Sequence, residues 1–225
     1  MAKIGAAAIF IALLFGTVPL SAQAQDIKAR NAARLARTPA TEGIFALEDN
    51  GDIRHLQSGM KCIAGYPNVE FFAVMIFPSA MGDGMDVGCD YARVDGQNRA
   101  VSKLTVFAVK APAGMTLDQA FDQYNREVLT KAPTAKHVGP VMTMNSVKGS
   151  EALPEFRSAE YDVVGNGISY RTDLVVALKA GWIVEIRATF LTGAVATEQD
   201  AAARAGDIVA PGVALLTAIQ HIAAR

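Results

Sequence analysis

The chain lacks a strong charge of either sign. Its 225 residues include 21 lysines and arginines and 22 aspartates and glutamates, which gives a net charge of −1. Proteins that bind duplex nucleic acid usually carry a basic patch and a high isoelectric point, so this balance does not favour such a partner. We therefore expect no nucleic acid among the partners of the protein.

Catalytic signatures are missing as well. The sequence has no G-x-S-x-G, H-E-x-x-H or P-loop motif, and its histidines, His55, His137 and His221, are scattered. Two cysteines without a nearby histidine cannot supply the four ligands of structural zinc. We predict no catalytic residue, no metal site and no cofactor. One alternative stays open, a periplasmic hydrolase with a non-standard site, which requires His55 or His137 within hydrogen-bond reach of a serine or aspartate in a cleft.

Long hydrophobic runs are absent after the first 24 residues. At the N-terminus, Lys3 precedes the apolar run 4–18, and residues 22–24 (AQA) fit a small-x-small cleavage site. This order is typical of a secretory signal peptide, so we expect residues 1–24 to be removed. The run is short for a membrane-spanning helix. The sequence thus predicts a mature protein in the periplasm or secreted, with no transmembrane segment after cleavage.

Cysteine is rare, since Cys62 and Cys89 are the whole inventory. Exported proteins keep structural disulfides, and an even count favours pairing. In MDVGCDYARV (85–94), strand alternation puts Cys89 on the apolar face with Val87 and Tyr91, where a bridge fits better than an accessible nucleophile. We predict a Cys62–Cys89 disulfide. Buried free thiols, or a catalytic or metal-binding role, are the alternatives.

Residues 25–42 follow the expected cleavage site. The stretch QDIKARNAARLARTPA (25–40) is rich in alanine and carries four basic residues and one acid. We interpret residues 25–42 as a flexible N-terminal leader, because chain ends are usually poorly ordered unless something holds them. The alternative is a basic helix that attaches to anionic partners in the envelope, which predicts salt-dependent binding.

Residues 43–225 read as one domain in which strands and helices are segregated. Extended apolar runs precede a helical segment at 115–133, whose Thr116 and Gln119 match a capping box. Further strands follow over 156–191, and the last residues have helical spacing. This order predicts an α+β fold, with an antiparallel sheet packed between a middle helix and a C-terminal helix as in an α/β/α sandwich.

The last hairpin carries a candidate ion pair. If residues 179–181 form a three-residue turn, the numbers of opposed residues sum to 360, and Leu174 lies opposite Ile186 in the core. The same register places Asp173 opposite Arg187 on the other face. We predict a cross-strand ion pair there, worth about 0.2–1 kcal/mol. The alternative is that Arg187 binds a ligand.

The order of elements resembles the PsbP/Mog1-like α/β/α sandwich proteins. The residues that carry the resemblance are MTLDQAFDQY (115–124), which opens the middle helix, and SYRTDLVVALKAGWIVEIRATF (169–190), which precedes the final helix. The resemblance spans residues 43–224 and implies a secreted or lumenal accessory protein. No site residue follows from it, because a fold does not determine a function. We expect a non-catalytic accessory or binding module with a small-molecule or protein partner in the cell envelope.

Overall fold

The computed structural model describes residues 20–66, 69–94, 100–144, 154–192 and 211–222. Its elements in chain order are α1 (Leu20–Arg37), β1 (Phe45–Leu47), β2 (Ile53–His55), β3 (Lys61–Cys62), β4 (Gly65–Tyr66), β5 (Val69–Ile76), β6 (Asp86–Val94), β7 (Ala100–Lys110), α2 (Leu117–Lys131), β8 (Lys136–His137), β9 (Met142–Met144), β10 (Phe156–Gly165), β11 (Ile168–Lys179) and β12 (Trp182–Leu191). Residues 211–221 are also helical.

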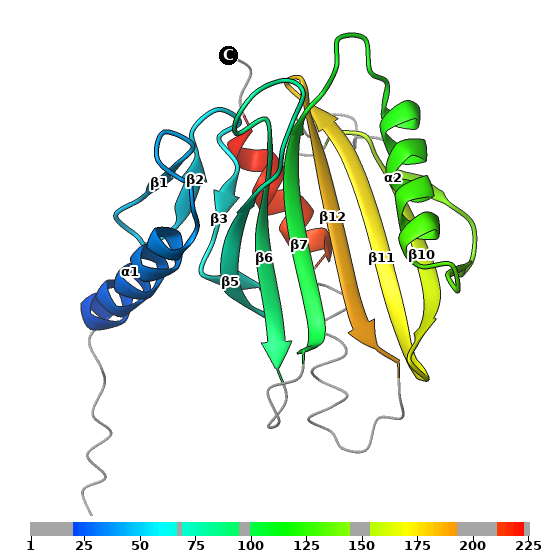
Figure 1. The fold of residues 1–225 in the computed structure, drawn as a ribbon, viewed down its shortest axis with the longest axis horizontal. Helices are drawn as coiled ribbons and strands as arrows, with labels where there is room; N and C mark the ends of the chain where they lie inside the picture. The colour runs from blue at the N-terminus through cyan, green and yellow to red at the C-terminus, as the bar shows by residue number, and fades with distance from the viewer. Residues whose placement is uncertain (1–19, 67–68, 95–99, 145–153, 193–210, 223–225) are drawn as a thin grey trace, which may run out of the picture.

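The strands form two antiparallel sheets. The small sheet has the order β1-β2-β3, and the large sheet has the order β4-β5-β6-β7-β12-β11-β10-β8, with β9 paired to β10. Helix α2 packs on one face of the large sheet and the helix 211–221 packs on the other (Figure 1). Helix α1 and the small sheet lie beside β5 (Figure 1). The chain therefore has the α+β class that the sequence predicted.

Each face of the large sheet carries an apolar core. Strand β11 contributes to both, because Val175 and Ala177 pack in the core with the last helix, while Leu174 and Val176 pack against α2. A strand that is buried on both faces shows no alternation of apolar and polar residues. This position explains the unbroken apolar run at 174–178.

Helix α2 begins with the capping box that the sequence predicted. The Thr116 side chain accepts a hydrogen bond from the Gln119 backbone N–H, and the Gln119 side chain accepts one from the Thr116 backbone N–H. The helix buries Phe121, Tyr124 and Val128 on one side. This apolar stripe packs over β10 and β11.

The N-terminal region differs from the flexible leader that the sequence predicted. Residues 20–37 form α1, which packs against β1 and β5. The Asn31 side chain is 1% exposed and donates a 2.8 Å hydrogen bond to the Gly51 carbonyl oxygen. Lys28 forms an ion pair of 2.9 Å with Asp49. The helix is ordered because these two contacts hold it to the turn between β1 and β2.

The register of the β11–β12 hairpin also differs from the prediction. The turn consists of two residues, Ala180 and Gly181, and both have positive φ angles (52° and 75°). This conformation is typical of two-residue type I′ hairpins. Lys179 therefore lies opposite Trp182, so the numbers of opposed residues sum to 361 rather than 360.

The predicted Asp173–Arg187 ion pair was wrong for this reason. Asp173 lies opposite Ala188, and Arg187 lies opposite Leu174. A register shift of one residue changes the face on which a side chain meets its partner. Asp173 and Arg187 consequently lie on opposite faces of the sheet.

Asp173 has a like-charged neighbour instead. Glu160 lies directly opposite it on β10. Asp173 Oδ1 is buried and has no hydrogen-bond partner in the part of the chain that the structure describes. Burial, followed by the charge of Glu160, raises the pKa of Asp173 to about 7. An ionised Asp173 therefore destabilises the folded protein.

Asp173→Asn should stabilise the protein at pH 8 by about 1 kcal/mol. An unfolded aspartate has a pKa of about 4, so between about pH 4 and pH 7 the folded state binds the extra proton and stability falls as the pH rises. The variant should flatten this fall, which urea unfolding at acidic and alkaline pH measures.

The matched control is Asp162→Asn. That exposed carboxylate pairs with Arg171 at 2.9 Å, so its removal should not stabilise the protein. An Asp173→Asn variant that is less stable than the wild type at pH 8 would contradict the expected direction.

Candidate functional site

A cavity of about 180 Å³ lies beside α2, on the face of the large sheet that this helix partly covers. Helix α2 packs over β10 and β11 (Figure 1), so strands β6, β7 and β12 line the cavity next to it. Its walls hold three acids, two bases, one tyrosine and three apolar side chains. These are Asp86, Glu127, Glu185, Lys131, Arg187, Tyr124, Phe77, Phe107 and Val109.

Strand pairing brings the sheet residues of the cavity together. Phe107 lies opposite Glu185 on one side and opposite Gly88 on the other. A Cβ atom at Gly88 would come within 2.9 Å of the Met75 side chain and 3.2 Å of the Phe107 ring. The absence of a side chain at Gly88 therefore leaves room for Phe107. Asp86 lies on the same face, two residues before Gly88.

Glu185 is only 2% exposed, although it carries an acidic group on a central strand. It forms an ion pair with Arg187, two residues further along β12. Burial raises the pKa of Glu185 to about 7, against the opposing effect of Arg187. Arg187 Nη2 also lies 3.9 Å from a carboxylate oxygen of Glu127, which pairs in turn with Lys131. Both bases of the cavity thus contact Glu127 or Glu185, but Arg187 Nε is buried and has no hydrogen-bond partner among the described residues.

Asp86 and Tyr124 differ from Glu127 and Glu185, because no described residue forms an ion pair with Asp86 or a hydrogen bond with the Tyr124 hydroxyl. Burial, and then the Glu127 carboxylate, raises the pKa of Asp86, and no described base lies within ion-pair distance. Tyr124 is 5% exposed, and its hydroxyl makes no hydrogen bond to any other described residue. Burial and the nearby acids raise the pKa of Tyr124, so its hydroxyl stays protonated. Buried polar groups are nearly always satisfied, so the unpartnered Arg187 Nε in the same wall points to an occupant of the cavity.

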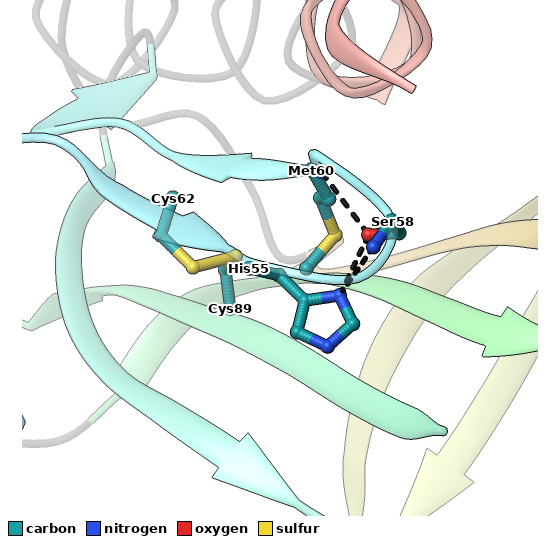
Figure 2. Close-up of a disulfide and its surroundings, with 5 residues drawn as sticks. All are labelled: His55, Ser58, Met60, Cys62 and Cys89. Carbon is teal, nitrogen blue, oxygen red and sulfur yellow. Dashed lines mark hydrogen bonds between the residues drawn. A yellow bond between two sulfur atoms is a disulfide. The ribbon is translucent and has the colours of Figure 1, made fainter. Parts of the chain in front are cut away.

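Cys62 and Cys89 are joined by a disulfide, and their Cα atoms lie 5.5 Å apart. The bond connects β3 of the small sheet with β6 of the large sheet, and both residues are fully buried (Figure 2). Side chains alternate along β6, so Cys89 lies on the face opposite to Asp86 and Gly88. The bond positions the small sheet and takes no part in the cavity.

His55 does not form the site that the hydrolase alternative requires. Its Nδ1 lies 2.7 Å from Ser58 Oγ, but both residues are buried (Figure 2). The His55 ring packs against the rings of Phe45 and Trp182. Ser58 Oγ also accepts a 3.1 Å hydrogen bond from the Met60 backbone N–H. The contact stabilises the turn between β2 and β3 and does not present a nucleophile in a cleft.

His137 is exposed on β8, where its ring centroid lies 4.7 Å from that of Tyr161. Within the described ranges, no three histidine, cysteine, aspartate or glutamate side chains lie close enough together to hold a metal ion. Among the described helices, none is long and apolar enough to cross a membrane.

Sequence patterns did not single out the cavity residues. The helical spacing predicts Tyr124 in the core but does not show that its hydroxyl faces a cavity. A signal is present in WIVEIRATF (182–190), where Glu185 and Arg187 share one face of an otherwise apolar strand. A charged side chain on such a strand is expected to have an ion-pair partner or a functional role, because burial of an unpaired charge is costly. For Arg187, the sequence predicts only an ion pair with Asp173 or, alternatively, binding of a ligand.

Comparisons with known proteins return a distant similarity of fold. No protein-family model matches the chain, and no curated protein sequence matches it. The structure is similar to the solution structure of cyanobacterial PsbP (CyanoP) from Synechocystis sp. PCC 6803, with a TM-score of 0.38 and 11% sequence identity. The match covers 67% of this chain and 92% of that chain. CyanoP belongs to the family that the order of elements resembles.

Proposed function

We propose that this protein is an exported, non-catalytic binding module that holds a ligand, or a side chain of a partner protein, in the cavity beside α2. The observation that carries the proposal is Arg187 Nε, which is buried in the cavity wall without a hydrogen-bond partner in the described chain. An unsatisfied buried polar group costs about 1–3 kcal/mol, and an occupant that satisfies it removes this cost.

Export to the periplasm or the medium is part of the proposal. The signal pattern of residues 1–24 supports it. The disulfide supports it independently, because structural disulfides persist in oxidising compartments and are rare in the cytosol. Together they favour a protein that folds and works outside the cytoplasm.

A periplasmic hydrolase is the second candidate. It rests on Glu185, whose pKa of about 7 would suit a general acid. However, Glu185 is almost completely buried and is bound by Arg187, so its carboxylate orients that base and is not open to a substrate. Binding therefore explains the cavity better than catalysis does.

Two measurements test export and binding separately. The full chain, expressed in a bacterial host, should give a periplasmic form whose intact mass begins at Gln25 and matches the oxidised protein. In an NMR titration of that protein with a fragment library, we expect shifts of the amides around the cavity. Tyr124→Phe should weaken the fragments that bind there.

The matched control for the titration is Tyr170→Phe on β11, which should leave fragment affinities unchanged. An uncleaved cytoplasmic precursor would contradict export. A library in which no fragment shifts the cavity amides of the wild type would contradict binding.

A further inference from the structure

We infer that the cavity beside α2 takes an uncharged primary amide group on a short alkyl chain, as in a small aliphatic amide or a glutamine side chain. The inference rests on the proposed function, because it names the chemistry of the occupant of the same cavity. The unpartnered donor in the wall, the charge of the wall and its aromatic rings each narrow the occupant to this class.

The buried group of the wall that lacks a partner is a donor. Arg187 Nε is buried and has no hydrogen-bond partner among the described residues. The contacts of Arg187 with Glu185 and Glu127 both use Nη2 and leave Nε unpaired. Nε carries a hydrogen and cannot accept a hydrogen bond, so only an occupant with an acceptor atom satisfies it. An alkane or an ammonium group would leave this donor without a partner.

The charge of the wall favours an acceptor that is itself uncharged. The wall holds three acids and two bases, and each base already contacts an acid. Among the three acids, Asp86 has no described base within ion-pair distance. A carboxylate at Arg187 Nε would therefore meet the negative charges of Glu185 and Asp86, and like charges repel strongly in a partly buried site. A carbonyl oxygen accepts the same hydrogen bond without this repulsion.

The other polar groups of the wall favour an amide over a ketone. The Asp86 carboxylate is half-buried and, when ionised, only accepts hydrogen bonds. A primary amide has two N–H donors beside its carbonyl oxygen, so it can accept from Arg187 Nε and donate to this carboxylate at the same time. The Tyr124 hydroxyl lines the same cavity and can donate to the second lone pair of the carbonyl oxygen. One uncharged group thereby serves the donors and the acceptors of the wall.

Apolar surface and size suit a short alkyl chain on the amide. The ring centroids of Phe77 and Phe107 lie 5.9 Å apart, with their planes inclined by 44°. Val109 lies two residues after Phe107 on β7, so it faces the same side of the sheet. These side chains offer apolar contact to methylene groups, whose transfer out of water is favourable. A cavity of about 180 Å³ admits an amide with a chain of a few carbon atoms.

The test is an NMR titration of the mature, disulfide-bonded protein at neutral pH with butyramide, butyrate, n-butylamine and 2-pentanone, which have chains of similar length. We expect butyramide to shift the backbone amides of β6, β7 and α2 around the cavity and the Nε–H resonance of Arg187. It should bind at least about tenfold more tightly than each of the other three compounds, which corresponds to about 1.4 kcal/mol.

Two arginine variants identify the donor that holds the amide. Arg187→Lys keeps the positive charge beside Glu185 but removes the Nε–H group, so it should weaken butyramide binding at least about tenfold. If this variant does not fold, the wild-type protein still tests the donor, because a hydrogen bond to the carbonyl oxygen shifts the Arg187 Nε–H resonance downfield.

The matched control is Arg157→Lys on β10. Arg157 Nε is also buried without a described partner, but its guanidinium lies over the Phe121 ring and not in the wall of the cavity. This variant should leave the affinity for butyramide unchanged.

The outcomes distinguish this inference from the proposed function. Equal or tighter binding of butyrate, butylammonium or 2-pentanone, an Arg187 Nε–H resonance that butyramide does not shift, or an unchanged affinity in folded Arg187→Lys overturns the amide site. If other fragments bind in the cavity and butyramide does not, the inference fails and the proposed function stands. If nothing binds there, both fail.

A comparison of N-acetylglutamine methylamide with a glutamine-containing peptide then identifies the source of the amide. Much tighter binding of the peptide indicates a partner protein, and equal binding indicates a small free amide.

Discussion

Replacing Cys62 and Cys89 together with alanine should lower the free energy of unfolding by up to about 3.5 kcal/mol. The bond spans 27 positions of sequence, and its loss increases the entropy of the unfolded chain. It also releases the small sheet from β6. Trp182 is the only tryptophan and its ring packs against His55 of the small sheet, so its fluorescence during urea unfolding reports this docking.

Two comparisons establish that the effect comes from the cross-link. Reduction of the wild-type protein should cost about as much as the double substitution. Each single substitution should also cost about as much, because either one breaks the same bond. A double variant that unfolds at the wild-type urea concentration would falsify the stabilising role of the disulfide.

Gly59→Ala should lower the free energy of unfolding by about 3 kcal/mol. Gly59 has a φ angle of +84°, a conformation that L-residues rarely adopt. A Cβ atom at this position would lie 2.3 Å from the His221 carbonyl oxygen, which belongs to the last helix. The methyl group would push residues 211–221 away from the turn between β2 and β3. Urea or thermal unfolding measures the loss.

Gly139→Ala is the matched control for the backbone cost. Gly139 has a similar φ angle of +78°, but a Cβ atom there would meet nothing within 4 Å. We expect a loss of about 1 kcal/mol from the backbone alone. The difference between the two variants isolates the contact with the last helix. Equal losses would mean that this helix does not approach Gly59 as closely as the structure has it.

Local patterns predicted the features that local interactions determine. The capping box of Thr116 and Gln119 lies within four residues, so the start of α2 could be read from the sequence. The even cysteine count, together with the predicted signal peptide, was enough to pair Cys62 with Cys89. Segregation of strands from helices was enough for the α+β class. These inferences need no knowledge of which strands are neighbours.

The hairpin register failed because it depends on the length of one turn. A two-residue turn at Ala180 and Gly181 replaces the expected three-residue turn and moves Asp173 to the face opposite to Arg187. Hydrophobic alternation could not correct the error, because the strand is buried on both faces. The order of α1 was missed for a related reason. It depends on Asn31 reaching Gly51, which lies 20 positions away in the sequence.

The cavity could not be predicted because distant segments build it. Tyr124 and Glu127 come from α2, whereas Asp86, Phe107 and Glu185 come from three strands that are neighbours only in the sheet. Gly88 also contributes to the cavity, because its lack of a side chain leaves room for Phe107. Each of these residues has an ordinary structural role when it is considered alone, and their arrangement around one cavity depends on the fold.

The disulfide also determines the path of a mechanical load through the molecule. Cys62 ends β3, before β4 and β5, and Cys89 lies within β6. A pull on α1 therefore reaches the large sheet through the sulfur–sulfur bond and leaves residues 63–88 unstretched. These residues have a contour length of about 90 Å, and a pulling force can extend them only after the bond is reduced. The distance to which this protein can be extended is thus under the control of thiol–disulfide exchange.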